Sequence, residues 1–102
     1  MLDPQGLYQS YSRAVEVTEA NQVVASADPR RVCIVFWRGL FLGDISVAPG
    51  SFAAATDGPI LGSFGTTEFY WSRHGPVVQE SWICTVSTPP YTLKYLETIF
   101  LG

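Results

Sequence analysis

The stretch RRVCIVFWR, residues 30–38, most restricts what this chain can fold into. It is rich in β-branched and aromatic residues, which favour strands, and its side chains alternate between two faces. Both faces are apolar, and this pattern is typical of a central strand that is covered twice, where the second cover can be a neighbouring subunit. One face carries Val32, Ile34 and Phe36, and the other carries Cys33, Val35 and Trp37.

The same period of two recurs along the chain between glycine and proline breaks. AVEVTEANQVVASA, residues 14–27, predicts two short strands with a turn at Asn21, and the following DPRR ends the second strand. ISVAPG predicts another strand, and residues 52–65 read as a long irregular connection. TTEFYWSRHG and QESWICTVS predict two strands, with HGPV as the hairpin corner between them.

The last segment, YTLKYLETIF, allows two interpretations. Its apolar spacing is compatible with a helix, but threonines and aromatic residues lower its helix propensity and no capping residue follows. A closing strand is therefore favoured. Short strands at regular intervals predict an all-β fold, a single antiparallel β-sandwich or a small jelly-roll-like barrel. We expect an extended N-terminal arm over residues 1–12 and one sandwich domain over residues 13–102.

The charge pattern restricts the partners. Only 15% of the 102 residues are charged and the net charge is −3, with the six basic residues scattered. A nucleic-acid partner needs a clustered basic surface, so none is expected. No apolar run is long enough for a membrane span and no signal peptide is recognisable. We expect synthesis in a cytoplasm, with Cys33 and Cys84 reduced. The low charge itself indicates an apolar surface that becomes an interface.

The residues with chemical potential do not form a recognisable catalytic motif. His74, the single histidine, is expected at an exposed turn, whereas Cys84 is expected mid-strand in the core. One histidine and two distant cysteines match no zinc spacing, and no phosphate-binding or nucleophile motif occurs. Paired carboxylates that meet only in the fold stay open. We expect no cofactor, no metal and no enzymatic activity; a β-sandwich hydrolase is the least favoured class.

Exposed aromatic residues are the best candidates for contacts. Phe69, Tyr70 and Trp71 are consecutive, so one or two of them must point away from the core. Trp37 and Trp82 lie in strong strands and are expected in the core or an interface. The candidate interface residues are Leu7, Tyr8, Tyr11, Trp37, Phe41, Tyr70, Trp71 and Tyr91.

The order of these segments also resembles a known class of protein. VEVTEANQVVASADPRRVCIVF, ISVAPG, DGPI, EFYWSRHGPVVQESWICTV and LKYLE follow one another over about residues 14–100. Together they resemble small β-sandwich virion structural proteins of tailed bacteriophages, of the head decoration or minor structural type. The motifs are turn signals rather than chemistry.

The resemblance implies a non-enzymatic virion component, a capsid decoration or stabilising subunit made in the host cytoplasm. Its partners would be the major capsid protein or other virion proteins, together with further copies of itself in a symmetric oligomer. The alternative function is a phage receptor- or glycan-binding module on head or tail, using Tyr70, Trp71 and their neighbours.

Overall fold

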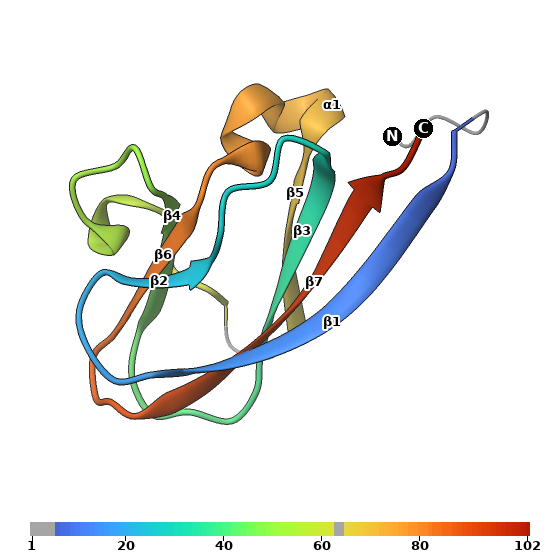
Figure 1. Cartoon of the computed structure of the whole chain (residues 1–102). Helices are drawn as coiled ribbons and strands as arrows, with labels where there is room; N and C mark the ends of the chain where they lie inside the picture. The colour runs from blue at the N-terminus through green and yellow to red at the C-terminus, as the bar shows by residue number, and fades with distance from the viewer. Residues whose placement is uncertain (1–5, 63–64) are drawn as a thin grey trace.

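A computed structural model describes residues 6–62 and 65–102 and shows a sandwich of two antiparallel sheets. The four-stranded sheet has the order β1-β7-β3-β5, and the three-stranded sheet has the order β2-β6-β4 (Figure 1). This confirms the all-β sandwich predicted from the sequence. The elements are β1 (Tyr8–Val17), β2 (Gln22–Ala25), β3 (Arg31–Arg38), β4 (Ile45–Pro49), η1 (Ala55–Asp57), β5 (Gly65–Tyr70), α1 (Trp71–His74), η2 (Gly75–Gln79), β6 (Trp82–Val86) and β7 (Tyr91–Phe100).

The strand β1 is longer than predicted and includes most of the expected arm. It begins at Tyr8 and pairs with β7 along its whole length. Leu7 extends the pairing, because its N–H donates to the Gly102 carbonyl and its carbonyl accepts from the Leu101 N–H. The boundary at residue 12 was therefore wrong, since the backbone of residues 8–12 finds its hydrogen-bond partners in β7. Residues 1–5 of the expected arm lie outside the described residues.

The turn after β1 moves the chain from one sheet to the other. Asn21 has a φ of 54°, in the left-handed region that asparagine tolerates better than most residues. Its side-chain oxygen accepts from the Ala55 N–H at 2.8 Å, and its own N–H donates to Thr85 Oγ1 at 2.9 Å. The turn predicted at Asn21 is confirmed, and it links the two sheets instead of closing a hairpin.

The core lies between the two sheets and is dominated by aromatic rings. Phe36 from β3 packs against Trp82 from β6 and Tyr95 from β7, with ring centroids 5.5 and 5.8 Å apart. Phe69 also reaches Trp82, at 4.7 Å. These contacts join strands of both sheets, and so the aromatic residues carry much of the apolar burial that stabilises the sandwich.

The closing segment is a strand, as favoured from the sequence. β7 pairs with β1 on one side and β3 on the other. Leu93 and Tyr95 point inward and are buried, whereas Lys94 is exposed on the opposite face. Residues 91–100 form a strand and not a helix because β7 is central in its sheet, and both of its edges are hydrogen-bonded to neighbouring strands.

The HGPV corner differs from the prediction. β5 and β6 belong to different sheets, so they do not form a hairpin. The chain crosses between the sheets through α1 and η2, which lie at one end of the sandwich (Figure 1). Gly75, with a φ of 74°, separates the two helical segments, and Pro76 sits in the first turn of η2, where a missing N–H costs nothing.

Candidate functional site

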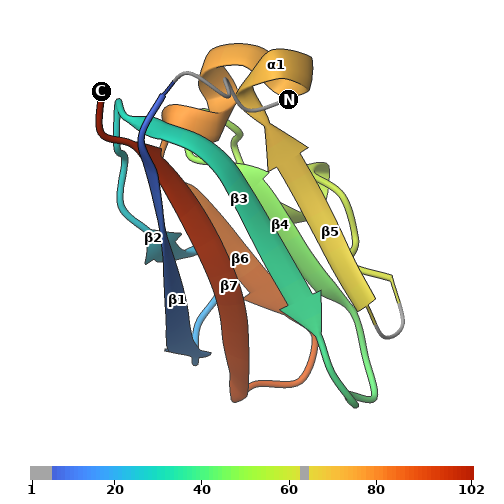
Figure 2. The same cartoon turned by 90° about the vertical axis from the view of Figure 1, so that its right-hand side faces the viewer.

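The two sheets differ in what covers their outer sides. On the three-stranded sheet, Ala55 of η1 is buried against Ala48 and Ile83. Figure 2 shows the outer side of the four-stranded sheet, and no described segment crosses in front of its strands. No other described segment covers the apolar residues that face outward there; Val35 and Leu96 remain partly exposed, whereas neighbouring side chains already bury Cys33.

We call this surface the outer face. Strand alternation and the register of β1, β7, β3 and β5 define its members. The side-chain contact between Ser10 Oγ and Thr98 Oγ1, at 2.9 Å, and the ring contact of Tyr8 with Phe100, at 5.3 Å, agree with this assignment. The outer face consists of Tyr8, Ser10, Ser12, Ala14, Glu16, Cys33, Val35, Trp37, Thr66, Glu68, Tyr70, Thr92, Lys94, Leu96, Thr98 and Phe100.

The centre of the outer face is uncharged. Val35 of β3 lies directly beside Leu96 of β7, and Cys33 lies beside Thr98 and Tyr70 on the two neighbouring strands. The charged members border this patch: Glu68 of the edge strand β5 lies directly opposite Val35, Lys94 lies beside Trp37, and Glu16 lies near the end of β1. An uncharged centre with a polar rim is the arrangement found in protein–protein interfaces.

A groove of about 590 Å³ opens at the end of the outer face next to the β3–β4 connection. Trp37, 36% exposed, contributes an aromatic ring to it. The Tyr91 hydroxyl accepts a hydrogen bond from the Gly39 N–H at 3.2 Å, which leaves its own proton available to a ligand. We call this the Trp37 groove, and its lining residues are Ser12, Trp37, Arg38, Gly39, Tyr91, Thr92 and Lys94.

The Trp37 groove carries positive charge in a protein that is acidic overall. Its lining contains Arg38 and Lys94 but no carboxylate. Among the described residues, neither of these cations takes part in an ion pair. Arg38 is held in place because its guanidinium donates to the carbonyls of Leu61, Phe41 and Gly43, whereas Lys94 is exposed and free to meet an anion.

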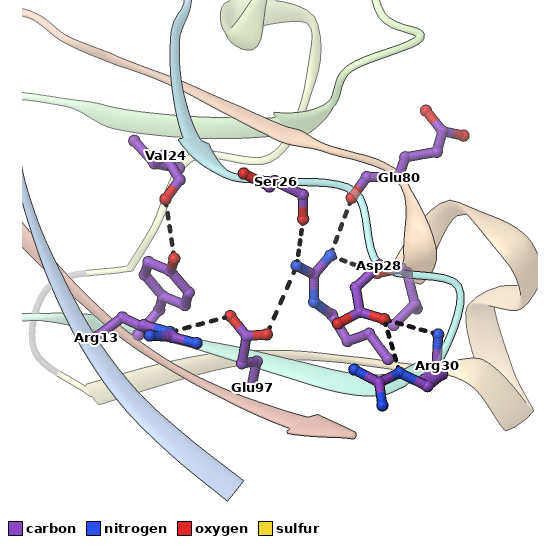
Figure 3. Close-up of polar contacts among 10 residues, drawn as sticks. Arg13, Val24, Ser26, Asp28, Arg30, Glu80 and Glu97 are labelled. Carbon is purple, nitrogen blue, oxygen red and sulfur yellow. Dashed lines mark hydrogen bonds and ion pairs between the residues drawn. The ribbon is translucent and has the colours of Figure 1, made fainter. Parts of the chain in front are cut away.

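A second, polar cleft of about 390 Å³ lies between the sheets, beside β1 and the segment after β2 (Figure 3). Arg31 is 1% exposed; it donates to the carbonyls of Ser26, Val78 and Glu80, and it lies 3.8 Å from Glu97. Glu97, 6% exposed, also pairs with Arg13 at 3.5 Å. These contacts join the β2–β3 and β5–β6 connections to β7, so we assign this cluster a structural role.

The sites of possible nucleophilic chemistry are separated. His74 is exposed on α1, where its Nδ1 accepts from the Tyr70 N–H at 3.1 Å and its ring meets Phe69. Cys84 is fully buried in the core, and this burial raises the pKa of its thiol to about 12. Burial, followed by the charge of Glu68, raises the pKa of Cys33 to about 11. Both thiols are therefore protonated at neutral pH, which disfavours attack by sulfur.

The cysteines are not joined by a disulfide, because Cys33 faces outward from one sheet and Cys84 lies on the inner side of the other. This confirms the expectation that they are unbridged. Across the described ranges, no three His, Cys, Asp or Glu side chains gather as metal ligands would. Within the same ranges, no helix has the length and apolar character to cross a bilayer.

The structure distributes the sequence-predicted interface residues over five places. Tyr8, Trp37 and Tyr70 share the outer face, while Phe41 stacks on Tyr91 at 4.7 Å beside the Trp37 groove. The remaining three lie elsewhere: Leu7 is exposed next to Leu101, Trp71 is exposed on α1, and Tyr11 faces inward beneath Arg13, with the guanidinium 5.2 Å from its ring.

Sequence reasoning missed the polar members of the groove. Alternation along β7 already places Thr92 and Lys94 on the side opposite Leu93 and Tyr95. Only the register of β3 against β7, which sets Trp37 beside Lys94, brings that cation to the aromatic ring. Comparison of the chain with protein-family models, curated proteins and solved structures gives no match, so the outer face and the Trp37 groove are interpreted from their own chemistry.

Proposed function

We propose that this protein is a non-enzymatic structural subunit of a bacteriophage virion, a capsid decoration or stabilising subunit, and that its outer face packs against a second copy. The observation that carries the proposal is the contrast between the two sheets. The chain covers one sheet with η1 and leaves the uncharged centre of the other open to a partner (Figure 2).

The size of the outer face suits such a contact. Four strands at about 4.8 Å spacing and about eight residues of length span roughly 19 by 26 Å. This footprint approaches the roughly 800 Å² that each partner contributes to a standard interface once side-chain relief and the rim are added.

The resemblance to phage virion proteins supplies the biological setting for this contact. A small subunit that must persist outside a cell gains stability by association, because binding to the native state lowers its free energy relative to the unfolded state. Self-association through the outer face would hide the partly exposed side chains of Val35 and Leu96 from water.

The test is the oligomeric state of the full chain, measured by light scattering coupled to size exclusion over a range of concentrations. We expect the wild type to be oligomeric and Val35→Lys to be monomeric, because a second copy would have to desolvate the ammonium, and an edge-strand pair with Glu68 opposite it does not offset that cost. Val23→Lys is the matched control. It places the same charge on an exposed valine of β2, 58% accessible, and should leave the oligomer intact.

A wild type that stays monomeric at millimolar concentration contradicts the proposal, as does equal loss of the oligomer in both variants. Binding to particles provides the second measurement. Wild-type protein should sediment with phage particles that lack it, and the Val35→Lys variant should not.

A further inference from the structure

We infer that the Trp37 groove is a binding site for an acidic saccharide, a pyranose unit that carries a carboxylate. The inference rests on the lining of the groove and not on the centre of the outer face, but four of the seven lining residues belong to the outer face, so the site is the one presented by the single chain. The groove volume of about 590 Å³ lies within the range of about 300–1,000 Å³ typical of small-molecule sites.

The first requirement of such a ligand is an apolar surface for the ring. Trp37 supplies it from β3, where it lies between Thr66 of β5 and Lys94 of β7. An aromatic face carries partial negative charge, and the C–H groups of a pyranose carry partial positive charge, so the two surfaces attract one another as they pack. The groove is open along the sheet, which admits a unit within a longer chain.

The second requirement is hydrogen bonding to hydroxyl groups. Ser12 and Thr92 line the groove with hydroxyls that can donate or accept, and the Tyr91 hydroxyl has a proton to donate. These three groups come from β1 and from the first two residues of β7, so pairing between the strands sets their separation. Convergent polar groups around an apolar platform are the pattern of a specific small-molecule site.

The third requirement concerns charge. Lys94 and Arg38 line the groove and have no carboxylate partner among the described residues, so an anionic substituent on the sugar would supply the missing charge. A nucleic acid fits less well. It places a phosphate at every nucleotide, and two cations on a chain of net charge −3 cannot match that density.

One carboxylate lies beside the groove and gives the inference a test of opposite sign. Glu16 faces Thr92 in the β1–β7 register but is not part of the lining. Its negative charge opposes an acidic ligand, so Glu16→Gln should strengthen binding, whereas Lys94→Gln should weaken it. A groove that recognised only the hydroxyls of a neutral sugar would respond to neither change.

The experiment titrates the full chain with an α-1,4-linked galacturonate tetrasaccharide and follows backbone and indole N–H signals by NMR. We expect shifts at the Trp37 indole and at the Thr92 and Lys94 amides. The dissociation constant should rise about tenfold in Trp37→Leu and about fivefold in Lys94→Gln, and it should fall in Glu16→Gln. Raising the salt concentration should weaken binding, because the charges are exposed.

Two matched controls separate the groove from the rest of the surface. Trp71→Leu removes a tryptophan of similar exposure, 44% against 36% for Trp37, and Arg73→Gln removes an exposed cation from α1. Both should bind as the wild type does. Far-ultraviolet circular dichroism and thermal midpoints confirm that each variant is folded.

Several results would overturn the inference. They are the absence of shifts at 10 mM tetrasaccharide (on the order of the weakest single-site affinities), equal affinity for neutral maltotetraose, shifts confined to Trp71, and tighter binding of adenosine monophosphate than of the tetrasaccharide.

Discussion

Replacing Arg31 with leucine should destabilise the protein more than any other single loss of a charged side chain. The guanidinium is 1% exposed and satisfies the carbonyls of Ser26, Val78 and Glu80 while facing Glu97 (Figure 3). Arg31→Leu leaves three carbonyls without this donor and leaves a carboxylate that is 6% exposed with only Arg13 beside it.

The magnitude follows from these contacts. Each of the three orphaned buried carbonyls costs about 1 kcal/mol, and Glu97 costs about 1 kcal/mol more, because its remaining pair with the partly exposed Arg13 does not replace Arg31. The total of about 4 kcal/mol agrees with the range for breaking a buried ion pair by removing one partner. In a domain of this size this lowers the thermal midpoint by about 20 °C.

Urea unfolding followed by tryptophan fluorescence measures the change, and Arg30→Leu is the control. Arg30 is the neighbouring residue, but its side chain is 61% exposed and pairs only with Asp28, so its loss should cost under about 0.5 kcal/mol. The double variant Arg31→Met with Glu97→Leu should recover part of the stability, because no buried charge is then left alone. If Arg31→Leu unfolds within about 1 kcal/mol of the wild type, the assigned structural role of this cluster is wrong.

Three further predictions concern the core, the cover and the turn. The pKa of the Cys84 thiol is about 12 in the folded protein and 9.0 when the thiol is exposed, so the unfolded chain loses this proton at lower pH. The contribution of Cys84 to the free energy of unfolding should therefore fall by about 1 kcal/mol between pH 9 and pH 10. Cys84→Ala should abolish that part of the pH dependence in urea titrations, and an unchanged slope would contradict the assignment. Ala55→Asp should cost about 2 kcal/mol, because it buries a carboxylate against Ala48 and Ile83. Ala53→Asp, at an exposed position of the same connection, should be nearly neutral. Equal urea midpoints for the two variants would contradict the packing of η1 on the three-stranded sheet. Asn21→Ala should cost about 1–2 kcal/mol, because alanine tolerates the left-handed φ poorly and the Ala55 N–H loses its acceptor. Asn21→Gly should cost less, because glycine tolerates this φ and only the acceptor is lost. Thermal unfolding that finds Asn21→Gly less stable than Asn21→Ala would contradict this explanation of the turn.

The strands and their two faces could be predicted from local pattern. Strand alternation places Ile34 and Phe36 on one face and Trp37 on the other, although both faces are apolar and the pattern alone does not say which one faces the core. The turn at Asn21 and the break before β3 follow from the conformational limits of asparagine and proline. These are properties of each segment alone, and nothing distant in the chain is needed to read them.

The assignment of strands to sheets was beyond reach of local pattern. The HGPV segment predicts a corner equally well for a hairpin and for a crossover between sheets, and the difference depends on where β5 and β6 find partners. Glu97 and Arg31 likewise read as ordinary charged residues, although they are buried together through the pairing of β7 beside β3.

The amino-acid sequence by itself determined an all-β chain with alternating faces and few charges, because these depend on short-range geometry and on counting. Tertiary structure alone decided that one sheet is covered by η1 while the other is open, and that Trp37, Tyr91 and Lys94 share a groove. The physical reason is register: strand pairing sets which side chains from distant segments become neighbours, and a shift of one residue would send Lys94 to the opposite face.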